Sequence, residues 1–183
     1  MFKKFLNLFS KKNPAVRPEI DEAWAQQWYA QKTALMVDRL GPEHDMVMHA
    51  VIPYAVGGGL DLYYFPNGIE GVGIATKELS DDPEEGSCND VFELYEFVMF
   101  TRHTMDLDQA KNDQTAFSKA HANINSVLNV IAQYSAQATL NPNETCEFPE
   151  EMENVGGKCF IFDAYPSESA TEEAGLFGVM VAI

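Results

Sequence analysis

Cysteine, basic residues and long apolar runs are all scarce in this sequence. Its three cysteines, Cys88, Cys146 and Cys159, are an odd number and lack the close spacing of a zinc site or a disulfide framework. We therefore expect reduced thiols and a cytoplasmic location. No apolar run approaches the ~20 residues that cross a bilayer. The N-terminus has neither the uninterrupted apolar stretch nor the small-residue cleavage site of a secretion signal.

Acidic residues outnumber basic ones, 28 against 12, and the formal net charge is −16. Five of the basic residues lie within residues 1–17, where no acid occurs, so the rest of the chain is more acidic than the total suggests. A body of this charge repels phosphate backbones, and we expect no nucleic-acid partner. A basic protein, by contrast, would be attracted through complementary fields.

Motifs of catalysis and of cofactor binding are missing as well. Gly57-Gly58-Gly59 precedes a predicted strand, whereas a phosphate-binding loop opens a helix, and no Gly-x-Ser-x-Gly nucleophile motif occurs. The histidines lack metal-ligand spacing. We therefore expect a protein that is not an enzyme and that holds no cofactor and no metal. The alternative is a hydrolase in which folding brings carboxylates together with His44, His49 or His103.

The first 17 residues are distinct from the rest of the chain. Four apolar residues at helical spacing share one face, with four lysines beside them: Phe2, Phe5, Leu6 and Phe9, and Lys3, Lys4, Lys11 and Lys12. We interpret residues 1–17 as a basic amphipathic segment with its linker, and residues 18–183 as one domain. The apolar face would dock on the protein itself or on a second subunit, or the segment would be disordered. A membrane-surface adaptor is the less favoured alternative.

Hydrophobic periodicity predicts an α+β domain. Helices are expected over 19–40 and 115–139, and strands over 46–52, 60–65, 71–77, 92–101, 158–163 and 176–183. Trp24 and Trp28 share a stripe of the first helix and are interpreted as core anchors. Asn67-Gly68 predicts a hairpin turn. The expected architecture is a largely antiparallel or mixed sheet packed by two long helices.

Several passages of the chain resemble the suppressor of fused family. Residues 73–81 form a predicted strand followed by Leu79-Ser80-Asp81 and a variable loop, and the strand over 91–99 begins Phe92-Glu93-Leu94. The later matching passages are the helix over 124–134, Thr145-Cys146, and the strands over 157–162 and 176–180. The resemblance runs from about residue 44 onward, and it implies a suppressor-of-fused-like domain.

This resemblance implies a non-enzymatic binding domain. Bacterial members look like small stand-alone versions, some of them candidates for immunity proteins that neutralise toxins. The animal protein has a second domain, for which we find no residues here. The chain stops within the last predicted strand, so we expect either that this strand presents an edge that a partner or a second copy covers or that the chain is shortened. The first reading makes a homodimer an alternative.

The favoured hypothesis is therefore a protein-binding module whose partner adds a strand to an exposed sheet edge. The residues expected at the recognition surface are those of the long predicted strand and of its preceding loop: Ser80, Asp81, Glu93, Tyr95 and Glu96.

Overall fold

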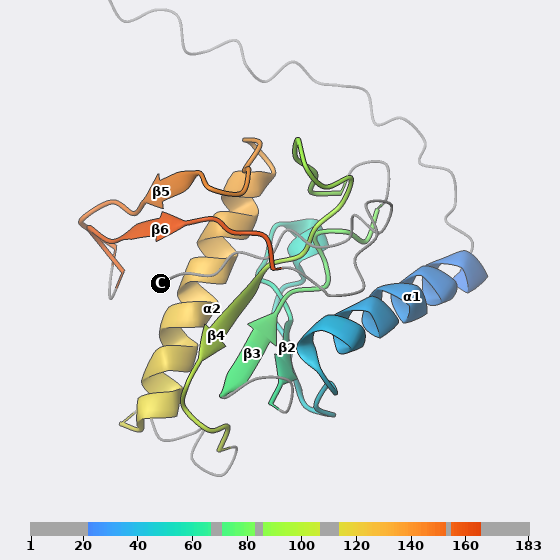
Figure 1. Ribbon diagram of the computed structural model, residues 1–183, viewed down its shortest axis with the longest axis horizontal. Coiled ribbons are helices and arrows are strands. Elements are labelled where there is room, and N and C mark those ends of the chain that lie inside the picture. The colour runs from blue at the N-terminus through green and yellow to red at the C-terminus, as the bar shows by residue number, and fades with distance from the viewer. Residues whose placement is uncertain (1–21, 67–70, 83–85, 107–113, 153–154, 166–183) are drawn as a thin grey trace, which may run out of the picture.

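The computed structural model describes residues 22–66, 71–82, 86–106, 114–152 and 155–165 (Figure 1). Two helices, α1 (Glu22–Leu40) and α2 (Ala116–Ser135), accompany a short 3-10 helix, η1 (Tyr54–Val56). The strands are β1 (Val47–Met48), β2 (Leu62–Phe65), β3 (Val72–Ala75), β4 (Val98–Thr101), β5 (Thr145–Glu147) and β6 (Cys159–Ile161). The fold is α+β, as the periodicity predicts. The N-terminal segment with Phe2, Phe5, Leu6 and Phe9 and the predicted strand over 176–183 lie outside the described residues.

The four strands β1 to β4 form one sheet in sequence order, and every neighbouring pair is antiparallel. Tyr64 pairs with Ile74, which in turn pairs with Met99, so the register runs straight across the three longest strands. The strands β5 and β6 form a separate antiparallel pair in which Cys146 faces Phe160. The predicted antiparallel sheet is thus confirmed for the described residues.

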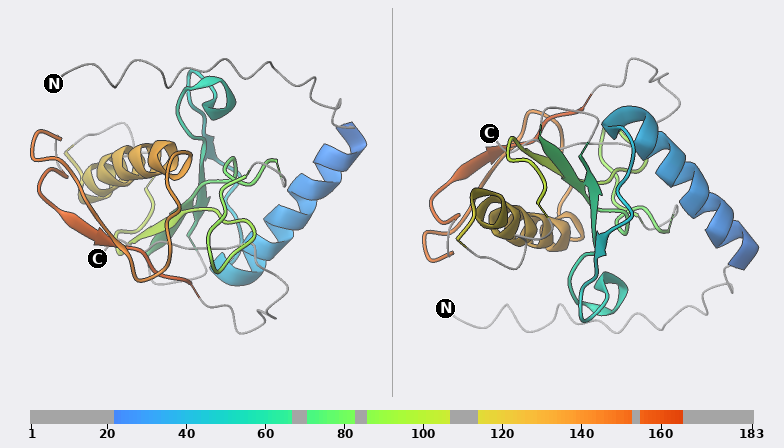
Figure 2. Two further views of the ribbon diagram at one scale, coloured as in Figure 1. Left: turned by 90° about the horizontal axis from the view of Figure 1, so that it is seen from above. Right: turned by 90° about the horizontal axis from the view of Figure 1, so that it is seen from below.

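The main sheet lies between the two helices (Figure 2). Successive strand residues point to opposite faces, and both faces here are apolar. One face, with Leu62, Tyr64 and Ile74, packs in the cluster that contains the buried residues of α2. The other face, with Tyr63 and Phe65, packs with the C-terminal half of α1. Burial on both sides explains why these strands lack the polar alternation of a half-exposed sheet.

The helix α2 is the element that the sequence defines best. Thr115 adopts an extended conformation at the N-cap, and its hydroxyl accepts a hydrogen bond from the amide of Ser118 at 3.1 Å. Ile124, Leu128 and Ile131 then form the buried stripe. The helix ends at Ser135, four residues before the predicted end at 139.

The helix α1 confirms the predicted helix where it is described, but its buried face is different. Trp24 is 40% exposed and Trp28 only half-buried, so the interpretation of both as core anchors is wrong for Trp24. The buried positions are Lys32, Met36 and Leu40, which follow Trp28 at intervals of four residues. Because one of these buried positions is a lysine, the pattern of apolar residues alone does not predict the buried face of α1.

Three strand predictions need correction. The predicted strand over 92–101 is a strand only from Val98, because Tyr95 donates its amide to the carbonyl of Ser87 at 3.0 Å and so leaves the ladder. The predicted strand over 46–52 is reduced to β1, and the rest is a loop. The strand β5 was not predicted, because residues 145–147 contain only one apolar side chain. In the described part of the chain, no helix combines the length and the hydropathy that spanning a bilayer requires.

Candidate functional site

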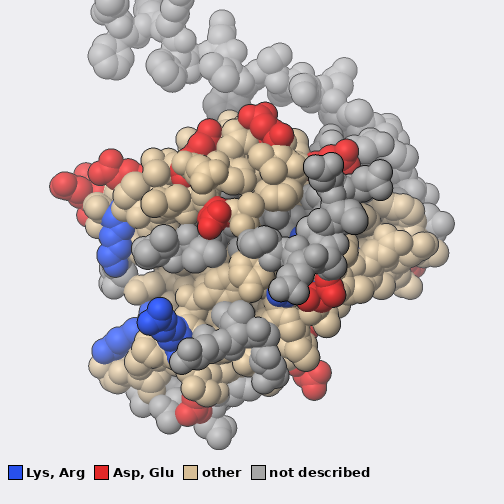
Figure 3. Space-filling view, in the orientation of Figure 1, with Lys and Arg blue, Asp and Glu red and all other residues tan. Residues whose placement is uncertain are grey.

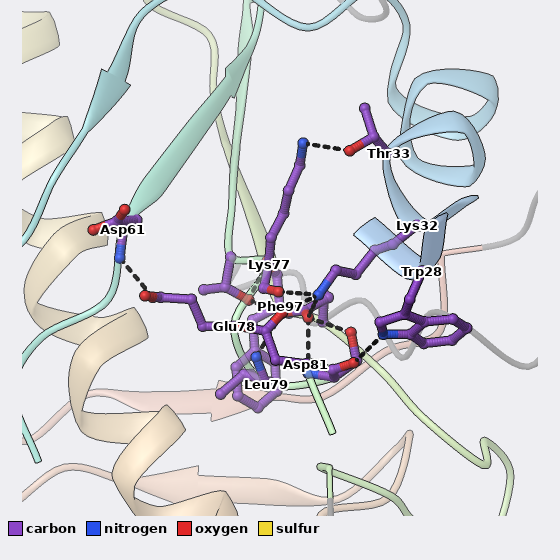
Figure 4. Close-up of polar contacts among 12 residues, drawn as sticks. Trp28, Lys32, Thr33, Asp61, Lys77, Glu78, Leu79, Asp81 and Phe97 are labelled. Atoms are coloured by element: carbon purple, nitrogen blue, oxygen red, sulfur yellow. Dashed lines mark hydrogen bonds and ion pairs between the residues drawn. The ribbon is translucent and has the colours of Figure 1, made fainter. Parts of the chain in front are cut away.

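A buried carboxylate, that of Glu96, is the centre of a polar network between α1 and the sheet (Figure 4). One of its oxygens accepts hydrogen bonds from the amide of Ser80 at 2.9 Å and from the Ser80 hydroxyl. The other accepts from the Thr76 hydroxyl at 2.7 Å and from the Leu79 amide at 3.3 Å. The Glu96 carboxylate is therefore satisfied almost entirely by the segment that follows β3.

The ammonium group of Lys32 supplies the opposite charge. Its Nζ lies 3.6 Å from the Glu96 carboxylate and 2.6 Å from Oδ1 of Asp81, and it also donates to the carbonyl of Lys77. Trp28, one turn earlier on α1, donates its indole N–H to the carbonyl of Ser80 at 2.7 Å. These bonds tie α1 to the segment 77–81 at fixed points.

Lys77 and Glu78, although adjacent, point in different directions (Figure 4). Lys77 Nζ donates to the Thr33 hydroxyl of α1 at 3.1 Å and to Glu43, which follows this helix, at 2.5 Å. It also lies 4.4 Å from the ring centroid of Tyr63. Glu78 points towards Asp61 and accepts from its amide at 2.7 Å. Lys77 is thus paired on the α1 side of the segment, whereas the Glu78 carboxylate lies on the opposite side.

A pocket of about 560 Å³ lies on the side that Glu78 faces. Its walls come from η1, from residues 78–82 and 86–88, and from the C-terminal end of α2 with the residues that follow it. The lining residues are Tyr54, Ala55, Glu78, Leu79, Asp81, Asp82, Gly86, Ser87, Cys88, Ser135, Ala136, Gln137, Ala138 and Thr139. They include three acids and no base.

The surroundings of Glu78 in the pocket shift the pKa of its carboxyl group. Burial raises the pKa of Glu78 to about 7, and the negative charges of Asp61, Asp81 and Glu96 act in the same direction. The hydrogen bond from the Asp61 amide favours the charged form and opposes the shift. Glu78 is therefore protonated more readily than an exposed glutamate, chiefly because its carboxyl group is partly buried.

The hydroxyl of Tyr95 is buried near the hydroxyls of Ser87 and Ser135, but it makes no hydrogen bond of standard geometry in the described part of the chain. The Tyr95 side chain is fully buried. Burial raises its pKa to about 12, while the nearby hydroxyls of Ser135 and Ser87 act to lower it. Those two serines line the pocket and lie 3.3 Å apart, oxygen to oxygen. A buried hydroxyl without a hydrogen bond of standard geometry is unusual, because such groups normally find a partner.

An apolar loop, residues 51–56, borders this pocket. Val51 is fully exposed, Ile52 is 58% exposed and Val56 is 73% exposed. The loop contains η1 and projects beyond the sheet (Figure 2). Exposed apolar residues are ordinary when scattered singly, but a contiguous group commonly marks an interaction site.

The apolar loop is held in one conformation despite its exposure. Tyr54 donates its hydroxyl to the carbonyl of Ala132 on α2 at 2.9 Å, and Asn129 of α2 accepts from the Leu60 amide at 2.9 Å. Gly58 lies against the loop so closely that a Cβ would come within 1.9 Å of the Ile52 carbonyl oxygen. Gly57 has a φ of 86°, a conformation that favours glycine. At least Gly57 and Gly58 of the three consecutive glycines are thus required by the backbone conformation that follows the loop.

A second depression of about 790 Å³ lies between α2 and the β5–β6 pair. Its lining includes Val130, Tyr134 and Phe148, with the acids Glu144 and Glu147 beside them. On the face displayed in Figure 3, the acidic side chains of the described residues lie at several separate positions.

The residues expected at a recognition surface do not share one environment. Ser80, Tyr95 and Glu96 are buried, and Ser80 and Glu96 bond to each other. Asp81 and Glu93 are exposed. Folding thus brings Ser80, Asp81 and Glu96 together around Lys32, a residue that the sequence analysis did not single out, and separates them from Glu93.

The histidines of the hydrolase alternative have different neighbours. His49 contacts the Asp61 carboxylate at 2.6 Å, whereas Nδ1 of His44 accepts from the amide of Met46. The backbone amide of His103 donates a hydrogen bond to the Thr101 hydroxyl. In the described ranges, no three histidine, cysteine or acidic side chains are placed to hold a metal ion.

Neither the apolar loop nor Lys32 was recognised as functionally interesting in the sequence. The loop has a usable signal, Val51-Ile52-Pro53-Tyr54 before three glycines, because proline and glycines oppose its assignment to a strand. Comparisons with protein-family models, with curated proteins and with solved structures find no match to this chain.

Proposed function

We propose that this protein is a non-enzymatic protein-binding module of the suppressor-of-fused kind. The observation that carries the proposal is the apolar loop, whose valines and isoleucine are exposed while its Tyr54 hydroxyl is hydrogen-bonded to the Ala132 carbonyl of α2. A surface that is already ordered loses little conformational entropy when a partner covers it. Exposed apolar side chains at the centre of a contact also supply most of the binding free energy.

The family likeness is a separate support, and it rests on the passages from residue 44 onward. An immunity or inhibitor role in a bacterium belongs to the same proposal. The free thiols of Cys88 and Cys159 are exposed, which suits a reducing compartment such as the cytoplasm. The net charge of −16 suits a basic partner, since complementary fields accelerate encounter.

The test is quantitative affinity capture from the source cell with the full chain as bait. The loop variant Val51→Ser/Ile52→Ser/Val56→Ser is compared with Val91→Ser, a matched control at a residue that is 60% exposed outside the loop. We expect at least one protein to be retained by the wild type and by Val91→Ser but lost with the loop variant. Capture of the same proteins by all three baits, or of none above background, would overturn the proposal.

The hydrolase alternative has one observation in its favour, the His49–Asp61 contact at 2.6 Å. A carboxylate that orients a histidine is one half of a nucleophile-activating arrangement. Within the described residues, no hydroxyl or thiol hydrogen-bonds to His49, so the nucleophile is not in place. Ester hydrolysis by the wild type that disappears in His49→Ala would favour this alternative. The described residues offer no observation for a membrane-surface adaptor.

A further inference from the structure

We propose that residues 176–183 add to the outer edge of β4, within the same chain, as a fifth strand of the main sheet. They lie outside the described residues, whereas all of β4 is described. This proposal is independent of the proposed function, because the apolar loop follows β1 at the other edge of the described sheet.

The strand β4 ends the sheet in the described part of the chain, where its one neighbour is β3. The amide of Thr76 donates to the carbonyl of Phe97 at 2.9 Å, and the same register continues residue by residue into β4. In an antiparallel ladder, the backbone groups of successive residues point alternately towards and away from the neighbouring strand. Phe97 and Met99 therefore face β3 with their N–H and C=O groups, and Val98 and Phe100 face away from it.

The outward backbone groups of β4 lie at an edge that is already buried. Val98 is only 1% exposed, so bulk water does not supply its partners. Among the described residues, the amides and carbonyls of Val98 and Phe100 have no hydrogen-bond partner. Buried N–H and C=O groups are almost always paired. A further strand provides donors and acceptors at the spacing that these groups require.

A strand at this edge has to be apolar on both faces. Met99 packs in the cluster on the α2 side, and Val98 packs in the cluster on the α1 side. A strand added beside β4 continues both faces. Residues 176–183 meet this requirement, since they include no charged and no polar residue. Residues 166–175 do not meet it, because they include three glutamates.

The described chain reaches β4 shortly before this apolar segment begins. Phe162 belongs to the cluster on the α2 side, and Tyr165 packs against the cluster on the α1 side. The Tyr165 ring lies 5.3 Å from the ring of Phe100, centroid to centroid. Residues 163–165 therefore pass beside β4 from one face of the sheet to the other. The next ten residues, 166–175, can span ~33 Å, which exceeds the ~13 Å length of a four-residue strand.

A fifth strand changes the surface that a partner meets on this side of the sheet. The exposed edge then belongs to residues 176–183 and not to β4. A partner that adds a strand here would pair with residues 176–183, and it could reach the backbone of β4 only by displacing them.

The test is nuclear magnetic resonance of the isotope-labelled full chain. We expect nuclear Overhauser effects between backbone protons of β4 and of residues 176–183, and slow hydrogen exchange of the Val98 and Phe100 amides. Val179→Pro and Met180→Pro form a matched pair, because the N–H groups of successive strand residues point to opposite sides. Proline at the position that faces β4 should abolish the protection of both amides, whereas proline at the outward position should preserve it.

Unchanged exchange of the α2 amides in both proline variants shows that the rest of the fold is retained. Absence of Overhauser effects between β4 and residues 176–183 in the wild type would overturn the proposal, and so would equal protection of Val98 and Phe100 in all three proteins. A mixture of labelled and unlabelled chains tests the second copy, and effects that arise between chains would overturn pairing within one chain. Effects that require an added partner protein would overturn it as well. Loop-dependent capture of a partner tests the proposed function separately.

Discussion

Residues of the same type differ in their contribution to the fold, and Glu96 is the clearest example. Its carboxylate is buried and accepts hydrogen bonds from Ser80, Thr76 and Leu79 while it faces Lys32. Glu93, three positions earlier, is exposed. The same chemical group therefore has a structural role at one position, whereas the exposed position carries no comparable network.

We expect Glu96→Gln to lower the free energy of unfolding by ~3–5 kcal/mol, because the change leaves the Lys32 charge without its buried counterpart. Glu93→Gln is the matched control and should leave the free energy of unfolding unchanged. Urea unfolding followed by circular dichroism measures both. Equal stabilities of the two variants would show that the Glu96 network contributes nothing to folding.

Glu78 makes stability depend on pH in a direction opposite to that of a carboxylate in an ion pair. Its pKa is about 7 in the folded protein against 4.5 for the unperturbed group, so folding favours its protonated form. The contribution is fully present below about pH 4.5 and is lost as the pH rises through about 7. Glu78→Gln removes this contribution.

We therefore expect the difference in unfolding free energy between Glu78→Gln and the wild type to grow in favour of the variant from pH 5 to pH 8. Urea unfolding at several pH values measures the difference. Burial lowers the pKa of His121, which makes stability fall at acid pH, but this effect is common to both proteins and cancels in the comparison. A difference that stays constant across this range would contradict the assignment.

At the scale of elements, α1 is attached to the sheet by its C-terminal half and by a few polar bonds. Trp28 donates to the Ser80 carbonyl, whereas Trp24 stacks on Trp28 at 6.2 Å between ring centroids and is 40% exposed. Two tryptophans one turn apart thus differ in one hydrogen bond to the body of the protein.

We expect Trp28→Phe to cost ~1 kcal/mol of unfolding free energy, the net contribution of one hydrogen bond, and more if the Ser80 carbonyl stays unsatisfied. Trp24→Phe retains a ring for stacking and removes no hydrogen bond among the described residues, so it should cost less. Thermal and urea unfolding of the two variants provide the comparison. A larger loss with Trp24→Phe would show that the exposed ring is the more important anchor.

The elements that periodicity predicts well are those in which apolar packing alone decides the structure. The helix α2 and the antiparallel pair β2–β3 are of this kind. Sequence analysis fails where a polar group is buried or a loop is apolar. Lys32 interrupts the apolar stripe of α1. In residues 92–97 the Tyr95 amide bonds to the Ser87 carbonyl, and the Glu96 carboxylate is buried against Thr76, Leu79 and Ser80. The apolar loop over 51–56 has strand-like composition, but its proline and the following glycines fix another path.

The candidate site was predictable only in part. Ser80, Asp81 and Glu96 were selected as positions on the long predicted strand and in its preceding loop. They do lie together in the structure, but around Lys32, which is at least 45 residues away in sequence from the residues that it contacts. The pocket combines segments from three parts of the chain, and no local spacing encodes such a meeting. Only the loop has a sequence signal of its own.

At the scale of the whole molecule, the two layers on the sheet are unequal. The cluster on the α2 side contains most of the buried apolar residues, whereas the cluster on the α1 side consists of Met36, Leu40 and four residues of the sheet. Segments with few buried apolar contacts open at a lower free energy than the core of a domain.

We therefore expect backbone amides in the first half of α1 to exchange with solvent faster than those of the buried stripe of α2. Hydrogen–deuterium exchange followed by nuclear magnetic resonance measures the two sets under native conditions. Removal of the Lys32 anchor in Lys32→Met should accelerate exchange in α1 more than in α2. Identical protection of both helices would mean that the molecule opens only as one unit.

The lysine that penetrates the interface between α1 and the sheet also determines where this helix sits along its axis. A helix held by apolar side chains alone can shift by one turn, ~5.4 Å, and still bury a similar area. Lys32 excludes such a shift, because its ammonium group would leave the oxygens of Lys77, Asp81 and Glu96 for an environment without acceptors. The single charged side chain of Lys32 thus fixes the position of α1 along its axis relative to the sheet.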